Sequence, residues 1–208
     1  MDTVLFDLDD TLIVEWKSAE ESFIETIGQI DHKIDIDEFI KTIRGQAKEL
    51  WYKLPTIDFC LNIGISSWEA LWAEFDGNDN HYKILRDLSA NYRFETWNQT
   101  LIKFNINNPD VANKLSLEFK KIRDTKHKLF PETKGTLDKF KSLFKLGIIT
   151  NGDPDLQWKK INGGNLKHFF NYITISGEHG YAKPNKRLFD IAMDGLKAKK
   201  IKCHYGWR

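Results

Sequence analysis

Two acidic side chains follow the first apolar run of the chain, and their types and spacing suit phosphoryl transfer. Asp7 and Asp9 come directly after the run Thr3–Phe6. A carboxylate can attack phosphorus as a nucleophile. A second carboxylate two residues further on can protonate the leaving oxygen and later accept a proton from water. The pair therefore indicates a reaction centre at the end of the first predicted strand.

A hydroxyl, an amide and a lysine follow the next two apolar runs. Thr150 and Asn151 come directly after Leu146–Ile149, and Lys183 comes after Tyr172–Ile175. The Thr150 hydroxyl and neighbouring backbone amides could hold phosphate oxygens, whose charge Lys183 would offset. Ligands of open α/β sheets bind beyond the carboxyl ends of the strands, so we expect these groups to converge with the two aspartates.

Strands and helices in alternation must position these groups. Continuous apolar runs of this length are typical of strands that are buried on both faces of a parallel sheet. The predicted elements are strands 3–6, 146–149, 172–175 and 201–206, and helices 136–144, 156–161 and 185–196. This order predicts an α/β fold with a doubly wound parallel sheet.

The segment between the first and second strands has a helical character. Over residues 15–128 the apolar residues recur at spacings of three and four, which predicts an insertion of about four to six helices. Asp35 and Glu38 have the spacing of a helix-starting cap. Tryptophans are concentrated in this segment, and we interpret them as part of its core. They are Trp16, Trp51, Trp68, Trp72 and Trp97.

Composition excludes several other classes of protein. The 208 residues carry a net charge of +1, with 41% hydrophobic and 29% charged residues, as in ordinary globular proteins. The balanced charge argues against a nucleic-acid binder that relies on a basic field. No apolar run approaches the ~18 residues of a membrane span, and residues 1–14 lack the basic start of a signal peptide. Cys60 and Cys203 form no CxxC pair, which indicates either a reducing compartment or indifference to redox conditions. We expect a cytoplasmic protein.

Three motifs, in this order, resemble those of the haloacid dehalogenase-like (HAD) hydrolase superfamily. They are FDLDDTL at Phe6–Leu12, GIITNG at Gly147–Gly152, and GYAKPN at Gly180–Asn185, which contains Lys183. The position of the helical insertion is similar to that of the branch with a C1-type helical cap after the first motif. The resemblance implies a Rossmann-like core and covers nearly the whole chain.

The resemblance also implies a division of the chain and a role for each motif residue. Residues 1–14 and 129–208 would form the HAD-like core, and residues 15–128 the cap. In this family the first aspartate, here Asp7, is the nucleophile, and the second, Asp9, is the general acid and base. The threonine of the second motif, Thr150, binds phosphate together with the amides of Asn151 and Gly152. Lys183 matches the catalytic and phosphate-binding lysine of the third motif.

The implied function is a Mg²⁺-dependent phosphatase that hydrolyses a small phosphomonoester through an aspartyl-phosphate on Asp7. Its partner would be a small phosphorylated metabolite, with no nucleic acid and no membrane involved. Dehalogenases of the family lack the second aspartate, so Asp9 favours phosphoester chemistry over dehalogenation. A phosphomutase uses the same pair of aspartates and stays open.

The sequence departs from the family pattern at its fourth motif. In this family Mg²⁺ is held by the nucleophile's carboxylate (Asp7), by the backbone carbonyl of the general acid (Asp9) and by an aspartate of the fourth motif. In the matching stretch, Cys203–Arg208, Trp207 stands at the position of that aspartate. Asp153 is an alternative ligand, since Mg²⁺ usually takes one or two carboxylates.

We interpret this departure as a C-terminal truncation with two consequences. First, loss of this ligand would weaken metal binding. The alternative to an active phosphatase is therefore a catalytically weak or inactive remnant that binds only phosphate or a partner. Loss of the neighbouring strand would expose a sheet edge, which favours pairing with a second chain and hence a homodimer.

Overall fold

The computed structural model describes residues 2–30, 33–198 and 203–204. Contacts divide the chain into two compact units. The first unit consists of Met1–Glu15, Asn62–Gly64 and His127–Arg208, and the second of Trp16–Leu61 and Ile65–Lys126. Sequence analysis placed the boundaries of the helical insertion at 14/15 and 128/129, whereas contacts place those of the second unit at 15/16 and 126/127. It also assigned residues 62–64 to the helical insertion. They belong to the first unit, with which Asn62 and Ile63 form hydrogen bonds and which Gly64 approaches closely at Asn151.

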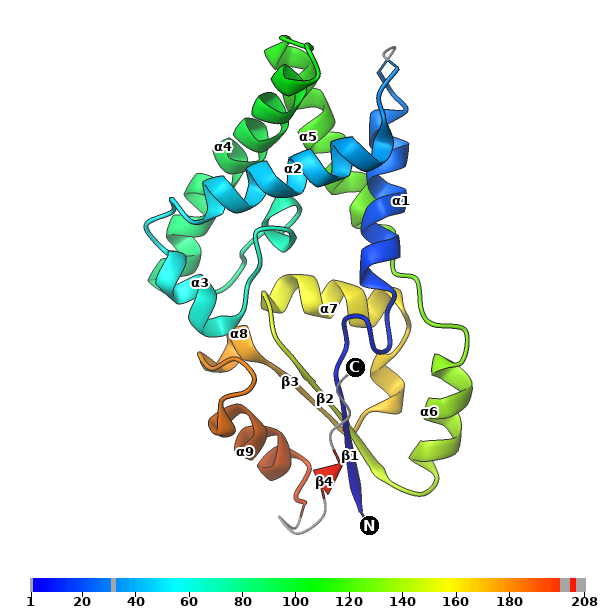
Figure 1. Cartoon of the computed structure of the whole chain (residues 1–208). Helices are drawn as coiled ribbons and strands as arrows, with labels where there is room; N and C mark the ends of the chain where they lie inside the picture. Colours follow the sequence, from blue (N-terminus) through cyan, green and yellow to red (C-terminus); the bar gives the residue numbers. More distant parts are fainter. Residues whose placement is uncertain (1, 31–32, 199–202, 205–208) are drawn as a thin grey trace. The chain divides into compact units, whose positions relative to one another are not determined.

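A parallel sheet forms the centre of the first unit (Figure 1). Its strands are β1 (Thr3–Phe6), β2 (Lys145–Thr150), β3 (Tyr172–Ile175) and β4 (Cys203–His204), in the order β3-β2-β1-β4. Its helices are α6 (Thr133–Lys141), α7 (Pro154–Gly163), the short α8 (Ser176–His179) and α9 (Lys186–Gly195), with a 3₁₀ turn at Lys167–Phe169. The predicted α/β class with a parallel sheet is confirmed.

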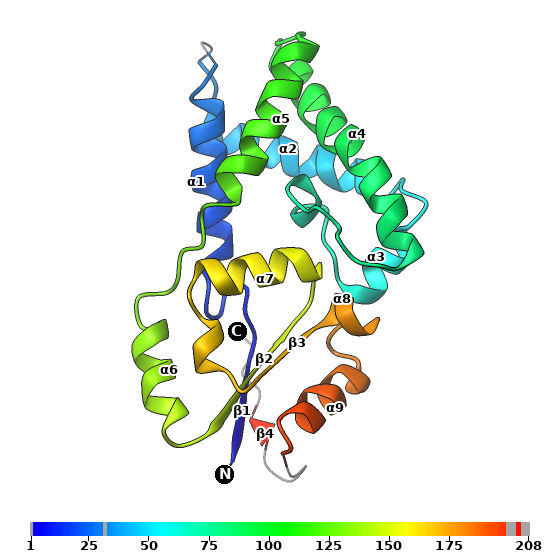
Figure 2. The same ribbon diagram turned by 180° about the vertical axis from the view of Figure 1, so that it is seen from behind.

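The sheet carries a hydrophobic core on each face, as expected for strands with continuous apolar runs. Neighbouring residues of β2 point to opposite faces, with Ile148 in one core and Ile149 in the other. The first core includes Leu137 of α6 and Ile161 of α7, and the second includes Leu188 of α9. Figure 2 shows the same arrangement from behind, with α6 and α9 on opposite sides of the strands.

The last predicted strand, 201–206, is found in part. Cys203–His204 pairs in parallel with β1, with Thr3 opposite Cys203. Residues 201–202 and 205–208 lie outside the described residues. The interpretation of Trp207 as the replacement of a metal ligand therefore concerns a residue that the structure does not describe.

Two helices of the first unit begin at side chains that cap them. Asp153 precedes α7 and its Oδ1 accepts a hydrogen bond from the Leu156 amide at 3.3 Å. Asn185 precedes α9 and its Oδ1 accepts from the Arg187 amide at 3.0 Å. Such caps satisfy amides that have no partner within the helix. They fix where each helix begins relative to the strand before it.

Helices form the second unit. They are α1 (Glu15–Ile27), whose first residue belongs to the first unit, α2 (Ile36–Trp51), α3 (Ile57–Ile63), whose last two residues belong to the first unit, α4 (Asn80–Lys103) and α5 (Pro109–Arg123), with a 3₁₀ helix η1 (Glu69–Leu71). Asp35 caps α2, as its spacing from Glu38 predicted: its Oδ1 accepts from the Glu38 amide at 2.9 Å. No helix in the described part of the chain is long and apolar enough to cross a lipid bilayer.

Aromatic rings form much of the core of the helical unit. Phe23 of α1 stacks on Phe119 of α5 with their ring centroids 4.2 Å apart, and Trp97 of α4 lies against both. Trp51 and Trp72 are buried as well. The expectation for Trp16 was wrong, because this side chain is 54% exposed. Helical spacing alone does not distinguish the first turn of a helix, where one flank faces solvent, from its middle.

Candidate active site

Asp7 and Lys183 form an ion pair at the carboxyl edge of the sheet. Asp7 follows β1 directly, and the Lys183 Nζ lies 2.6 Å from Asp7 Oδ1. The same oxygen accepts a hydrogen bond from the Leu8 amide at 2.7 Å. The Lys183 side chain is only 6% exposed, so water screens this pair less than a surface pair. The structure thus brings the first and third sequence motifs together.

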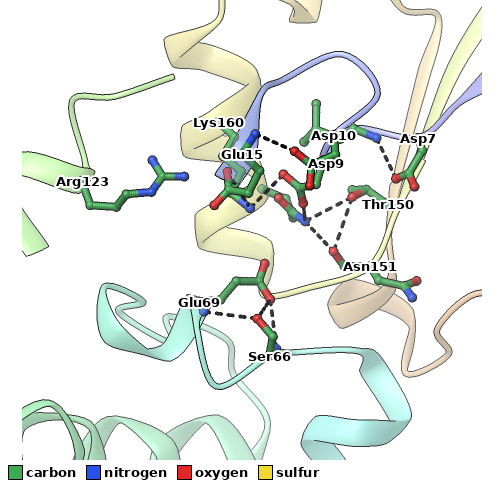
Figure 3. A network of polar contacts seen from close by, with 12 residues as sticks. Asp7, Asp9, Asp10, Glu15, Ser66, Glu69, Arg123, Thr150, Asn151 and Lys160 are labelled. Carbon is green, nitrogen blue, oxygen red and sulfur yellow. Dashed lines mark hydrogen bonds and ion pairs between the residues drawn. The ribbon is translucent and has the colours of Figure 1, made fainter. Parts of the chain in front are cut away.

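Asp9 faces helix α7 and is held through both of its oxygens. Lys160 donates to Oδ1 at 3.0 Å (Figure 3). The Gln157 amide donates to Oδ2 at 2.9 Å. Burial raises the pKa of Asp9 above its usual value, and the carboxylate of Glu15 adds to the rise. The charge of Lys160 and the hydrogen bonds from Gln157 and Lys160 act in the opposite direction. Sequence analysis predicted Asp9 at the site but neither of these partners.

Gln157 also connects Asp9 to the second motif. Its Nε2 lies 3.1 Å from Thr150 Oγ1 and is close to the Asn151 carbonyl oxygen. Thr150 ends β2 and its side chain is buried. The residues assigned to proton transfer and to phosphate binding therefore share one hydrogen-bonding partner.

Asn151 and Gly152 contact other parts of the first unit. The Asn151 Oδ1 accepts from the Lys183 amide at 2.7 Å, and its Nδ2 donates to the Lys183 carbonyl at 3.3 Å. The side chain of Asn151 thus fixes the backbone of the lysine that reaches Asp7. The Gly152 amide, which the resemblance assigns to phosphate, donates here to Ser176 Oγ at 2.9 Å.

A second contribution that sequence analysis missed is the segment Asn62–Gly64, which we call the 62–64 strap. The Asn62 side chain donates to the Gly180 carbonyl at 2.8 Å, and the Asn62 carbonyl accepts from the Ala182 amide at 3.0 Å. The Ile63 carbonyl accepts from Ser176 Oγ. These bonds connect the strap to helix α8 and to the loop that leads to Lys183. Local periodicity carries no signal for such a contact, since its partners lie more than a hundred residues away.

Gly64 is the point where the strap passes closest to the second motif, and we expect Gly64→Ala to disturb the site. Gly64 has φ +76°, and an added Cβ would lie 2.9 Å from the Asn151 Cβ. The left-handed backbone and the overpacking together should lower the free energy of unfolding by roughly 2–4 kcal/mol. Asn151 must shift, and Lys183 with it, so activity should fall in protein that remains folded.

Chemical denaturation and steady-state rates of the two proteins would check this prediction. Gly135→Ala is the matched control, because Gly135 lies within α6 and a Cβ there meets no atom within 4 Å. Equal stability of Gly64→Ala and the parent protein would contradict the expected clash.

Asp7 and Asp9 would offer oxygen ligands to a magnesium ion. The carboxylate of Asp7 and the backbone carbonyl of Asp9 are the oxygen ligands that Mg²⁺ prefers. Within residues 2–30, 33–198 and 203–204, however, no three His, Cys, Asp or Glu side chains are grouped as metal ligands. Asp153, the alternative ligand, is fully buried and caps α7. The described residues would thus offer Mg²⁺ two oxygen ligands, without a third acidic side chain grouped with them.

Comparison with known proteins places these motifs in a family. A family model described as haloacid dehalogenase-like hydrolase matches residues 1–204. A phosphoserine phosphatase of Thermus thermophilus is 30% identical over 194 residues, which cover 93% of this chain and 75% of that protein. A glyceraldehyde 3-phosphate phosphatase of Methanothermobacter thermautotrophicus is 30% identical over 125 residues, 57% of this chain and 54% of the relative.

Solved structures agree on the fold. The magnesium-bound HAD-hydrolase YfnB of Bacillus subtilis superposes with a TM-score of 0.60 at 17% identity, over 97% of this chain and 74% of that one. A 2-haloacid dehalogenase from Pseudomonas syringae gives a TM-score of 0.55 at 19% identity, over 98% and 76%. At these identities the likeness concerns the fold alone, while the family match covers nearly the whole sequence. The chain belongs to the haloacid dehalogenase-like hydrolases, a family of enzymes.

Proposed function

We propose that this enzyme is a phosphatase that hydrolyses a small phosphomonoester through an aspartyl-phosphate on Asp7. The observation that carries the proposal is the second carboxyl, Asp9, held two residues beyond an Asp7 that is paired with a buried lysine. Displacing a halide from carbon needs no proton donor, whereas an alkoxide leaving from phosphorus does. The names of the two curated relatives above, both phosphatases, support the same chemistry.

In the first step, a carboxylate oxygen of Asp7 attacks phosphorus and the bond from phosphorus to the ester oxygen breaks. We assign the attack to Oδ2, because Oδ1 is engaged by Lys183 and the Leu8 amide. Asp9 gives its proton to the leaving oxygen, so that the product departs as a neutral alcohol. Lys183 offsets the negative charge that gathers on the phosphoryl oxygens.

In the second step, water attacks the phosphorus of the aspartyl-phosphate. Asp9, now ionised, accepts the proton of that water, and the bond between phosphorus and Asp7 breaks. Phosphate leaves, and both carboxyl groups return to their starting states. Thr150 would hold a phosphoryl oxygen through both steps. The Asp7 carboxylate and the Asp9 backbone carbonyl would hold Mg²⁺, which when bound would supply further positive charge to the phosphate oxygens.

The helical unit is proposed as the cap, and its side chains as the source of substrate specificity. This assignment follows from its place in the chain, between the first and second motifs, and from the family resemblance. It leaves the identity of the phosphomonoester to experiment.

The test is release of phosphate from phosphoserine, glyceraldehyde 3-phosphate and 4-nitrophenyl phosphate, with Mg²⁺ and with a chelator. Release of chloride from 2-chloropropionate is measured in parallel. We expect phosphate release that the chelator reduces, no chloride release, and a phosphoryl adduct on the acid-quenched protein by mass spectrometry. Chloride release without phosphate release would show a dehalogenase instead.

The second interpretation is a catalytically weak chain that binds phosphate. The observation behind it is that the described residues contain no group of three or more His, Cys, Asp or Glu side chains that could hold a metal ion. It predicts that folded protein binds inorganic phosphate by calorimetry yet turns over none of the esters. That result would overturn the proposed phosphatase activity.

A further inference from the structure

Helix α7 carries a buried lysine whose charge is directed at the proposed acid. The Lys160 side chain is 1% exposed, and its Nζ lies 3.0 Å from Asp9 Oδ1 and 3.7 Å from Glu15 Oε2. Lysine is almost never fully buried unless it is paired, because desolvation of its ammonium group is costly. The lysine is therefore placed where it contacts Asp9, a residue with a proposed role in the reaction.

Gln157 lies one helical turn earlier on the same face of α7. Its Nε2 contacts Asp9 Oδ2 at 2.9 Å, Thr150 Oγ1 at 3.1 Å and the Asn151 carbonyl. Its Oε1 is buried and has no hydrogen-bond partner among the residues that the structure describes. A buried carbonyl without a partner costs stability. The Gln157 side chain thus donates to the acceptors of the site, and its unpartnered carbonyl lowers the stability of the fold.

The helix that carries these two residues is firmly anchored. Asp153 caps its first turn, and Leu156 and Ile161 are fully buried. A carboxyl on a loop can rotate, but contacts from a packed helix to each of its two oxygens restrict it to one orientation. Figure 3 shows Asp9, on the loop after β1, directed at Lys160 on the helix.

We propose that Lys160 and Gln157 are positioning residues that together hold the Asp9 carboxyl in the orientation from which it protonates the leaving oxygen. The inference rests on the proposed phosphatase function. Lys160 holds one oxygen of Asp9. Gln157 holds the other and aligns it with the phosphate-binding hydroxyl of Thr150. Both residues act through Asp9, and neither is assigned a contact with the substrate.

Lys160→Met tests this through the leaving group. Phenyl phosphate needs a proton donor, whereas 2,4-dinitrophenyl phosphate expels a stable anion and does not. We expect kcat/KM for phenyl phosphate to fall by about 10- to 100-fold, the scale of a carboxyl misplaced by about an ångström. The value for the dinitrophenyl ester should change little. Lys159→Met, on the same helix but paired with Asp155 at 3.5 Å, is the matched control and should behave as the parent enzyme.

Gln157→Met is a second variant, in case Lys160→Met does not fold. It keeps the Lys160 ion pairs and removes only the side-chain amide of Gln157. It should show the same selective loss on phenyl phosphate. In the Asp9→Asn background, Lys160→Met should cost no further kcat/KM, since a residue that acts through Asp9 has nothing left to position.

Equal losses on both esters, or a full additional loss in the Asp9→Asn background, would show that Lys160 and Gln157 only support the fold and would overturn the proposal. Parent enzyme that cleaves neither ester, although folded, would instead refute the phosphatase function and the positioning role with it.

Discussion

Asp7→Asn should lower kcat/KM for phosphate esters by roughly 10⁴- to 10⁶-fold, the scale seen when a hydrolase loses its nucleophile. An amide of nearly the same shape replaces the carboxylate, but it cannot attack phosphorus. Its Oδ1 can still accept the hydrogen bond from the Leu8 amide. The covalent phosphoryl adduct should disappear as well, which intact-protein mass spectrometry would detect.

Asp10→Asn is the matched control, because it removes one negative charge from the same loop. The Asp10 Oδ1 accepts a hydrogen bond from the Glu15 amide at 2.9 Å, and asparagine keeps that acceptor. Asp10 has φ 53°, a left-handed conformation that asparagine also tolerates. We expect the control to retain most of the activity. Comparable turnover of Asp7→Asn and the parent enzyme would refute Asp7 as the nucleophile.

Asp7→Asn also leaves a buried lysine without its ion-pair partner, so its fold must be checked separately. The Lys183 side chain is nearly buried, and loss of the opposing charge should lower stability. A thermal melt of both variants separates this effect from chemistry. The activity comparison is valid if Asp7→Asn melts cooperatively, even at a lower Tm than the parent enzyme, and is folded at the assay temperature.

The strands were predictable from the sequence because every residue of a strand buried on both faces lies in an apolar environment. Strands buried on both faces are apolar without interruption, and β1 and β3 have the predicted bounds, 3–6 and 172–175. Asp7 and Thr150 could be placed for the same reason, since each directly follows such a run. The carboxyl ends of parallel strands meet at one edge of the sheet, where ligands of open α/β sheets bind, so residues that follow different strands can be expected at one site.

The contributions of α7 and of the 62–64 strap could not be predicted in this way. The helix was expected at 156–161, but polar residues on an amphipathic helix indicate a solvent face by default. Whether Lys160 contacts water or Asp9 depends on packing between two residues 151 positions apart in the sequence, which no local pattern predicts. A short motif names the reacting groups, while the residues that orient them come from the tertiary structure.

Lys183→Met should reduce kcat/KM by about 10²- to 10³-fold, the scale of losing one group that stabilises developing charge. Methionine matches the length of the lysine stem but removes the ammonium that lies 2.6 Å from Asp7 Oδ1. Inhibition by inorganic phosphate should weaken too, because the site loses its nearby positive charge. Lys186→Met is the matched control: this lysine is 81% exposed and pairs with Asp190 on the surface of α9.

The two measurements on Lys183→Met separate two roles of the lysine. The Asn151 side chain forms hydrogen bonds with both the backbone amide and the backbone carbonyl of Lys183. The backbone that carries the Lys183 side chain is therefore fixed in position. A fixed ammonium can orient the Asp7 carboxylate, attract phosphate, or do both. If turnover falls while the inhibition constant for phosphate is unchanged, Lys183 serves only to orient Asp7 and the phosphate-binding part of the prediction is wrong. If both change, the lysine acts on the nucleophile and the substrate alike, as the charge of a phosphoryl group next to an ionised aspartate requires.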